Sequence, residues 1–272
     1  MKPLPDVVTK ALAFTRAGLS RPSEVPARIR ARIESGGSGG PGGRYEAVGG
    51  GVALVRLHEL LGAPYPCQGC DGFEQVWAAV RARVTGRAAG VEPHDADRLL
   101  ALLVWTATRH VRPQAVVETG VARGLTTACI LAALEANGTG RLWSIDLPPI
   151  AARWRTETGS AVSDTGRERW TYVRGPSRSR LKQVLREAGP VGVFVHDSLH
   201  TAPNMRFEFE CAWPPLVRGG VLIADDIDDN DAFGRFFSSA PEVAGWLAVK
   251  EADKDAIAGI AVKTASRPDG GA

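Results

Sequence analysis

The pattern of hydrophobic and polar positions changes character near Ala115. From there onward, short apolar runs alternate with segments in which apolar residues recur at helical spacing. The runs predict strands at residues 115–117, 142–145, 170–174, 191–196 and 221–224, and the segments between them predict helices at 125–136, 179–188 and 204–213. Strands that alternate with helices indicate a parallel sheet with right-handed crossovers.

Two further apolar runs, at residues 246–250 and 257–263, are joined by the charged turn EADKDA. A short polar connection between two strands predicts an antiparallel hairpin. We therefore expect the α/β class, with a doubly wound, mostly parallel, seven-stranded sheet that ends in this hairpin.

The N-terminal third has a different texture. Nine glycines within residues 35–51 predict a flexible loop, and Pro93 suits the first turn of a helix over 93–111. Helical spacing predicts further helices at 7–19, 52–61 and 73–84. We expect a helical N-terminal extension over 1–92, an α/β domain over 93–265 and a disordered tail over 266–272.

Composition narrows the classes of function. The chain has 272 residues, 44% of them hydrophobic, so it can bury a large core. Its formal charge of +3 is nearly balanced, whereas nucleic-acid-binding proteins concentrate basic residues on one face. The longest apolar runs, such as 99–105, are far shorter than the roughly 18 residues of a membrane span, and no signal-peptide pattern is present. We expect a cytoplasmic protein that binds neither nucleic acid nor membrane.

Four cysteines are present, and Cys67 and Cys70 form the motif CQGC. A structural zinc site would need a second pair of Cys or His ligands, and none stands at the usual spacing. We interpret the two as loop thiols, with a metal site and a disulfide or redox pair as alternatives. Cys129 and Cys211 lie in helical patterns and are expected in the core.

The segment ETGVARG follows the first strand of the alternating region and precedes a helix. Glycine is needed at such a turn because the chain bends sharply and must admit a ligand close to its backbone. The dinucleotide pattern GxGxxG fails at two of three positions, where Ala122 and Leu125 stand. The pattern ExGxGxG of S-adenosylmethionine-dependent methyltransferases fits Glu118, Gly120 and Gly124, with Ala122 as the only departure. An acid here suits an α-ammonium group better than a pyrophosphate.

Asp146 follows the next strand, twenty-two residues after Gly124. A carboxylate at this place can accept hydrogen bonds from both hydroxyls of a ribose. The alternative is a strand-end cap before Pro148 and Pro149.

On these residues, the chain from about Pro93 to Lys263 resembles the class I S-adenosylmethionine-dependent methyltransferases. Within them it is similar to the branch that includes macrocin-type sugar O-methyltransferases and cephalosporin-hydroxylase-like proteins. The matching segments are VVETGVARGLTT, LWSIDLP, VFVHDSLHT with Glu208 and Glu210 following, and PPLVRGGVLIADDI. Ser198 replaces the glycine of the pattern DGxH in that branch. Residues 1–90 carry no recognised resemblance.

The resemblance implies a Rossmann-like methyltransferase fold, S-adenosyl-L-methionine as cofactor, and O-methylation of a hydroxyl on a sugar or small natural product in secondary metabolism. The cofactor-binding residues that it implies are Glu118, Thr119, Gly120, Ala122, Gly124, Asp146, Ser177 and Asp197. Relatives hold Mg²⁺ with three acids, which match Asp197, Asp225 and Asp226. The alternative is that Asp197 contacts the substrate while the other two acids cap their strand.

His200 and Asp197 are the candidate catalytic residues. We expect His200 to be the general base, because an ordinary pKa near 6.5 leaves it mostly neutral at pH 7. The alternative is a loop histidine that hydrogen-bonds one of the acids. His196 is expected to point away from Asp197. The acids at 228, 229 and 231 and the arginines of the segment RGPSRSR are expected to be exposed to solvent.

Two other functions remain open from the sequence. An NAD(P)-dependent oxidoreductase is disfavoured by the missing glycines, the terminal hairpin and the absence of a Tyr-x-x-x-Lys pair. A non-catalytic S-adenosylmethionine-binding partner protein is the other alternative. We expect a small-molecule substrate, and the extension over 1–92 to form a lid or a homo-oligomer contact.

Overall fold

The computed structural model describes residues 21–36, 44–85, 95–150, 154–250 and 256–265. Within them, eight strands form one sheet in the order β1-β7-β8-β6-β5-β2-β3-β4. The strands are β1 (Ala47–Gly49), β2 (Ala115–Thr119), β3 (Arg141–Asp146), β4 (Trp170–Arg174), β5 (Val191–His196), β6 (Leu216–Ala224), β7 (Val243–Lys250) and β8 (Ile257–Lys263).

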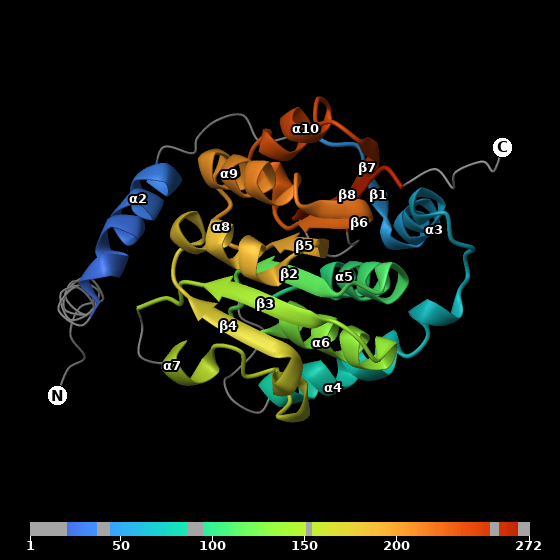
Figure 1. Cartoon of the computed structure of the whole chain (residues 1–272), viewed down its shortest axis with the longest axis horizontal. Coiled ribbons are helices and arrows are strands. Elements are labelled where there is room, and N and C mark those ends of the chain that lie inside the picture. The colour runs from blue at the N-terminus through green and yellow to red at the C-terminus, as the bar shows by residue number, and fades with distance from the viewer. Residues whose placement is uncertain (1–20, 37–43, 86–94, 151–153, 251–255, 266–272) are drawn as a thin grey trace.

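Helices cover both faces of this sheet (Figure 1). The α-helices are α2 (Val25–Gly36), α3 (Gly50–Leu61), α4 (Phe73–Thr85), α5 (Arg98–Val111), α6 (Leu125–Asn137), α7 (Trp154–Glu157), α8 (Ser177–Ala188), α9 (Ala202–Ala212) and α10 (Ala232–Phe237). Short 3₁₀ turns are η1 (Pro22–Glu24), η2 (Gln68–Cys70), η3 (Thr165–Arg169) and η4 (Ile227–Asp229).

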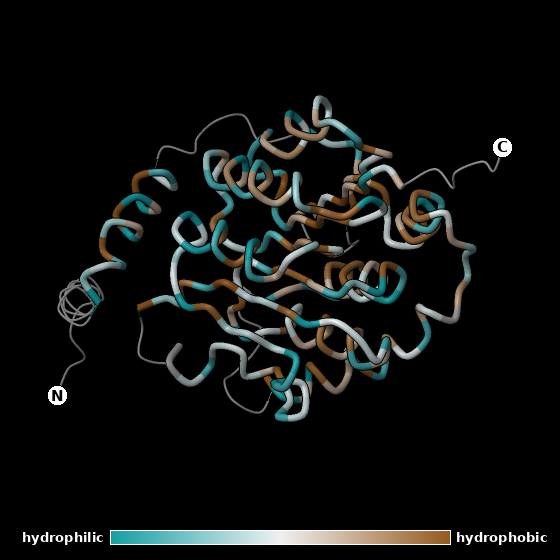
Figure 2. The backbone as a smooth tube through the Cα atoms, in the orientation of Figure 1, coloured by the Kyte–Doolittle hydropathy of each residue, from teal (hydrophilic) through white to brown (hydrophobic). Residues whose placement is uncertain are grey.

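The sheet confirms the expected fold class. Strands β2 to β6 pair in parallel, and β8 pairs antiparallel with both β6 and β7, which is the predicted terminal hairpin. Neighbouring residues of β2 belong to the two hydrophobic cores on opposite faces of the sheet. Val116 lies in the core formed with α3 to α6, and Val117 lies in the core formed with α8 to α10. Hydrophobic residues gather on the central strands and on the helix faces turned toward them (Figure 2).

The N-terminal extension is not wholly helical, in contrast to the prediction. Its β1 pairs in parallel with β7 and adds an eighth strand at the sheet edge. Leu57 of α3 and Val80 of α4 also belong to the same buried core as Leu103 of α5. Residues on either side of the predicted boundary at 92 and 93 therefore share one core.

Most other differences concern element ends. Helix α5 begins at Arg98, because the side chain of Asp97 caps it by accepting a hydrogen bond from Leu100 N at 2.6 Å. Pro93, the predicted helix 7–19, residues 37–43 of the glycine-rich loop, most of EADKDA and the tail from 266 lie outside the described residues. Within the described parts of the chain, no helix is both long and apolar enough to cross a membrane.

The order of the strands defines where a ligand is expected. From β2, the chain runs outward to β3 and β4, then returns to β5 and β6 on the other side of β2. Ligands of open α/β sheets bind at such a switch point, beyond the carboxyl ends of the strands. Strands β3 and β4 point toward the side of the molecule on which α2 lies, and α3 lies on the opposite side (Figure 1).

Candidate cofactor and catalytic site

The turn between β2 and α6 adopts a left-handed backbone at three of its positions. The φ angles are +87° at Gly120, +45° at Ala122 and +83° at Gly124. A Cβ on Gly120 would lie 1.7 Å from the carbonyl oxygen of Asp197, at the end of β5. Glycine is thus required at 120 because a neighbouring loop packs on it, whereas the sequence interpretation assigned the space to a ligand. Ala122 shares the left-handed conformation of the glycines that flank it.

Glu118 is fully buried at the carboxyl end of β2. Its Oε2 accepts hydrogen bonds from Ser144 Oγ at 2.7 Å and from Thr127 Oγ1 at 2.8 Å. Burial raises the pKa of Glu118 to about 7, although these hydrogen bonds act in the opposite direction. Oε1 accepts no hydrogen bond from the described residues. A buried oxygen without a donor is costly, and a ligand's cationic donor would satisfy it.

Asp146 lies on the neighbouring strand at the same edge. The register pairs Glu118 with Ser144 and places Asp146 beside the turn, where its Oδ1 is 3.4 Å from Val121 N. Tyr172 of β4 donates to Oδ2, also at 3.4 Å. Burial raises the pKa of Asp146 to about 6. Glu118 and Asp146 thus flank one turn, as a shared cofactor site requires.

Thr119 and Ser177, two further predicted cofactor residues, have their side chains engaged elsewhere. Thr119 Oγ1 donates to Glu208 Oε2 at 2.5 Å, and Ser177 Oγ donates to Asn204 Oδ1 at 3.4 Å. Only the backbone of Thr119, whose carbonyl accepts from Asp197 N at 2.8 Å, adjoins the turn.

Glu208 of α9, which the resemblance named without assigning it a role, lies at the centre of a buried polar network. It also accepts hydrogen bonds from Ser198 Oγ at 2.8 Å and Asn204 Nδ2 at 3.0 Å, and its Oε2 is 2.7 Å from His196 Nδ1. Burial raises the pKa of Glu208, but His196 and the hydrogen bonds outweigh this and lower it to about 2. His196 thus contacts Glu208, and the network holds the loop after β5 in place.

His200 lies between two carboxylates at the ends of β5 and β6. Its Nδ1 is 2.6 Å from Asp226 Oδ2, and its Nε2 is 3.7 Å from Asp197 Oδ1. Burial lowers the pKa of His200, but the two carboxylates outweigh it and raise the pKa well above 6.5. This direction favours a protonated ring, whereas the sequence interpretation expected a mostly neutral one.

The predicted metal ligands do not come together as a set. The group of potential ligand atoms at this edge, all within 4.8 Å of one another, is His200, Asp226 and Asp229. Asp197 and Asp225 lie outside it, and Asp225 is buried at the end of β6. Magnesium prefers oxygen ligands, whereas an oxygen of Asp226 is already bound by the His200 ring. This arrangement does not fit the Mg²⁺ site that was predicted.

Helix α2 is attached beside this edge by the arginines that were predicted to be exposed. Arg174, the last residue of β4, donates from Nε to Glu24 Oε1 at 2.9 Å, and Arg178 donates to Glu34 Oε1 at 3.2 Å. Thr201, after β5, donates to Glu34 Oε2 at 2.9 Å. Arg174 and Arg178 therefore hold η1 and α2, whereas Arg180, the third arginine of RGPSRSR, is exposed as predicted.

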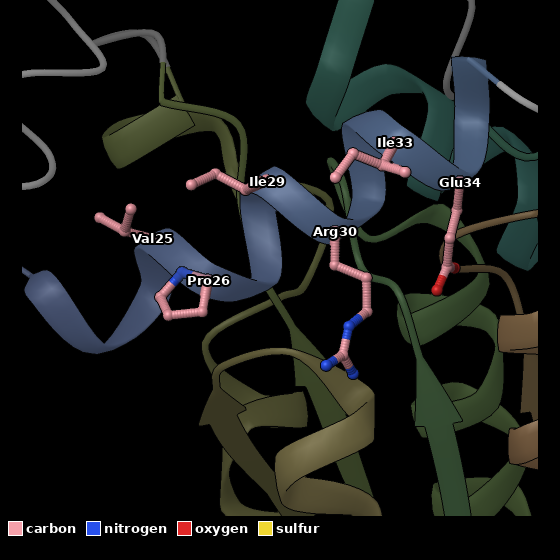
Figure 3. Close-up of a pocket in the computed structure, with 6 residues that line it drawn as sticks. All are labelled: Val25, Pro26, Ile29, Arg30, Ile33 and Glu34. Carbon is pink, nitrogen blue, oxygen red and sulfur yellow. The ribbon is translucent and has the colours of Figure 1, made fainter.

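A mostly apolar face of α2 lines an open hollow of about 500 Å³. Figure 3 shows its residues, which are Val25, Pro26, Ile29, Arg30, Ile33 and Glu34. None of the predicted cofactor residues lines this hollow. Several of them lie instead at the turn between β2 and α6.

A buried ion pair holds the turn between β2 and α6 in place. Arg123 donates from Nε to Asp95 Oδ1 at 2.8 Å, and a second guanidinium nitrogen contacts Asp95 Oδ2. Both side chains are almost fully buried. Sequence reasoning missed this pair, because 28 residues separate its members.

Comparison with known proteins agrees with this geometry. A family model described as a methyltransferase domain matches residues 117–227. Among curated proteins, no match reaches significance.

Solved O-methyltransferases have a similar fold. The O-methyltransferase from Bacillus cereus, in complex with SAH, has a TM-score of 0.52 at 17% identity, and the match covers 78% of this chain and 97% of that one. TomG from Streptomyces achromogenes, an O-methyltransferase of tomaymycin synthesis in complex with SAM, has a TM-score of 0.54 at 14% identity, with 78% and 96% covered. The SAH-bound methyltransferase PaMTH1 from Podospora anserina has a TM-score of 0.50 at 13% identity, with 81% and 99% covered. Residues 117–227 are therefore similar to a methyltransferase domain, and the chain shares the fold of these solved proteins.

Proposed function

We propose that this protein is an S-adenosylmethionine-dependent methyltransferase that acts on a hydroxyl group of a sugar or small natural product. One observation carries the proposal: two carboxylates, the buried Glu118 and the half-buried Asp146, flank a left-handed turn at the switch point of the sheet. The methyltransferase-domain match supports the reaction class. The O-methyltransferases among the similar structures support a hydroxyl as acceptor.

The residues at the turn fit this cofactor. Glu118 Oε1 can accept a hydrogen bond from its α-ammonium group, and Asp146 can accept hydrogen bonds from its ribose hydroxyls. Both partners are donors, which matches two acids and would not match a pyrophosphate. The turn from Gly120 to Gly124 brings its backbone beside Asp146, whose Oδ1 is 3.4 Å from Val121 N. When bound, the cofactor supplies an activated methyl group on a sulfonium, which is a good leaving group.

The acceptor hydroxyl must be aligned and must lose its proton. Asp197 and His200 are the candidates at the end of β5. The carboxylates of Asp197 and Asp226 favour a protonated His200, so Asp197 is the better candidate to accept the hydroxyl proton. We therefore assign Asp197 as the base and His200 as the cation that orients it. No step is routed through a metal, because the predicted Mg²⁺ ligands are not gathered.

Isothermal titration with S-adenosylmethionine tests the proposal. We expect saturable binding by the wild type, and weakening by about 10- to 100-fold in Asp146→Asn, since a hydrogen bond to a charged group contributes about 1.5–3 kcal/mol. The control is Asp164→Asn, which removes a fully exposed carboxylate and should bind like the wild type. Titrations with and without Mg²⁺ should agree.

Two outcomes would overturn the assignment. Tight binding of NADH in place of S-adenosylmethionine would favour the oxidoreductase. Binding of S-adenosylmethionine without transfer of its methyl group to any compound in a panel of sugar and small-molecule hydroxyls would favour the non-catalytic partner protein.

A further inference from the structure

We propose that His58, Cys67, Cys70 and His110 form a structural zinc site. Their ligand atoms all lie within 4.8 Å of one another. Cys67 Sγ is 3.2 Å from His58 Nε2, 3.0 Å from His110 Nε2 and 3.2 Å from Cys70 Sγ, and Cys70 Sγ is 3.5 Å from His58 Nε2. Two thiols and two imidazoles converging on one point are the Cys₂His₂ ligand set of structural zinc.

The spacing of these atoms suits a metal better than a disulfide. Zinc–sulfur and zinc–nitrogen bonds of about 2.3 and 2.0 Å place tetrahedral ligand atoms about 3.3–3.8 Å apart. The four observed distances, 3.0–3.5 Å, lie close to this range. A sulfur–sulfur separation of 3.2 Å is far longer than the roughly 2.05 Å of a disulfide bond. Both cysteines are free thiols.

The surroundings orient the ligands as zinc sites require. His58 is fully buried, and its Nδ1 is 2.6 Å from the carbonyl oxygen of Leu54, which leaves Nε2 directed at the thiols. A hydrogen bond from the second ring nitrogen to a carbonyl is the usual support of a metal-bound histidine. Arg109 Nε donates to Gly69 O at 3.3 Å and holds the CQGC turn against α5.

The position of the group indicates a structural role. His58 comes from α3, the cysteines from the turn around η2, and His110 from the end of α5. Helix α5 ends just before β2 begins, so the group lies at the amino ends of the strands (Figure 1). The cofactor turn lies at their carboxyl ends. Four protein ligands leave no open position for substrate, and the ion would join the N-terminal extension to α5.

This proposal takes up the metal site that the sequence interpretation left as an alternative to loop thiols for Cys67 and Cys70. The missing pair of ligands consists of histidines nine residues before Cys67 and forty residues after Cys70. Those intervals match no local zinc motif, and only the packing of α3 against α5 brings the four residues together.

Metal analysis of the tag-free, full-length protein, purified under reducing conditions and supplied with zinc, tests the proposal. We expect about one zinc per chain in the wild type, and less than about a tenth in the double variant Cys67→Ser/Cys70→Ser. The matched control is Cys211→Ser, which removes a half-buried thiol of α9 outside the group and should retain the zinc. Cobalt substitution should give thiolate-to-cobalt charge-transfer bands in the wild type and the control, and none in the double variant.

The wild-type measurements make the proposal falsifiable even if the double variant fails to fold. A chelator should lower the melting temperature of the wild type by more than about 5 °C, because an ion bound only by the folded state stabilises it. A wild type that takes up no zinc, or whose Cys67 and Cys70 form a disulfide that zinc and reductant do not displace, would overturn the proposal. Retention of a full zinc in the double variant would do the same.

Discussion

At the scale of single residues, Glu118 should make the stability of the ligand-free protein depend on pH. Its pKa in the folded chain is about 7, above its ordinary value of 4.5. Stability that depends on the protonated group is therefore fully present below about pH 4.5 and lost as the pH rises through 7. Above pH 7, the wild type should have lost about 3 kcal/mol of its free energy of unfolding relative to Glu118→Gln, because the pKa of Glu118 rises from 4.5 to about 7 on folding.

Urea unfolding at pH 5 and pH 8 measures this loss. The free energy of unfolding of Glu118→Gln relative to wild type should rise between the two pH values. The exposed glutamate of α6 provides the matched control, Glu135→Gln, which should parallel the wild type at both pH values. A constant difference between wild type and Glu118→Gln would show that the carboxyl is ionised across this range.

The turn after β2 offers a second test at the residue scale. Ala122 has a φ of +45°, and a left-handed backbone costs a non-glycine residue about 1–2 kcal/mol. Ala122→Gly should remove this cost and, after the greater entropy of the unfolded glycine is subtracted, stabilise the protein by about 0.5–1 kcal/mol. Chemical denaturation measures the change. The same substitution inside α6, Ala132→Gly, should instead destabilise by about 1 kcal/mol. Equal effects of the two variants would contradict the role of the turn.

At the scale of elements, α2 should be the least protected part of the site. None of its residues, 25–36, is fully buried, so polar contacts attach it. Arg178 and Thr201 bind Glu34 near its end, and Arg174 binds Glu24 of the preceding η1. Glu24→Gln/Glu34→Gln should raise the hydrogen-exchange rate of the α2 amides at least tenfold. The free energy of global unfolding should change by less than about 1 kcal/mol, because partly exposed ion pairs contribute little.

The exposed Glu187→Gln on α8 is the control for this exchange experiment. Unchanged exchange in α2 of the double variant would mean that its apolar side, with Ile29 and Ile33, holds the helix instead. Ile29 and Ile33 are exposed and could contact a second copy of the chain, but the oligomer contact expected from the sequence stays a prediction. A lid role for α2 is our proposal, since the helix lies beside the carboxyl ends of the strands (Figure 1).

The sequence predicts most strands well and misses one for a physical reason. Residues 170–174, 191–196 and 257–263 are strands as predicted, because apolar runs bounded by polar residues or glycine mark buried strands directly. Strand β1 has three residues, too few to show any periodicity, and it exists only because β7 offers an unpaired edge.

For the candidate site, the sequence predicts the positions of residues that follow from local pattern, but not the contacts between distant segments. Acids at strand ends, such as Glu118 and Asp146, follow from local pattern, because strand direction fixes their position. The engagement of Thr119 by Glu208 and the charge of His200 depend on how α9 and β6 pack against β5. Contacts between segments that are far apart in the chain produce no pattern of fixed spacing in the sequence, so they could not be predicted from it.

At the scale of the whole molecule, the N-terminal extension should unfold together with the α/β domain. Leu57 of α3 is fully buried in the core that also contains Leu103 and Val116, and β1 continues the sheet. Leu57→Ala should therefore destabilise the entire protein by about 2–5 kcal/mol, the usual effect of a large-to-small change in a core. The far-ultraviolet circular dichroism and tryptophan fluorescence transitions should shift together in urea.

The control for this prediction is Val55→Ala, at a partly exposed position of the same helix, which should cost less than about 1 kcal/mol. Two separate transitions, with only the first shifted by Leu57→Ala, would show that residues 1–92 form an independent unit as the sequence suggested. A single shifted transition would instead mean that the extension is part of the methyltransferase fold in this chain. In that case a zinc ion between α3 and α5 would stabilise the whole molecule, because it would tie together two parts of one cooperative core.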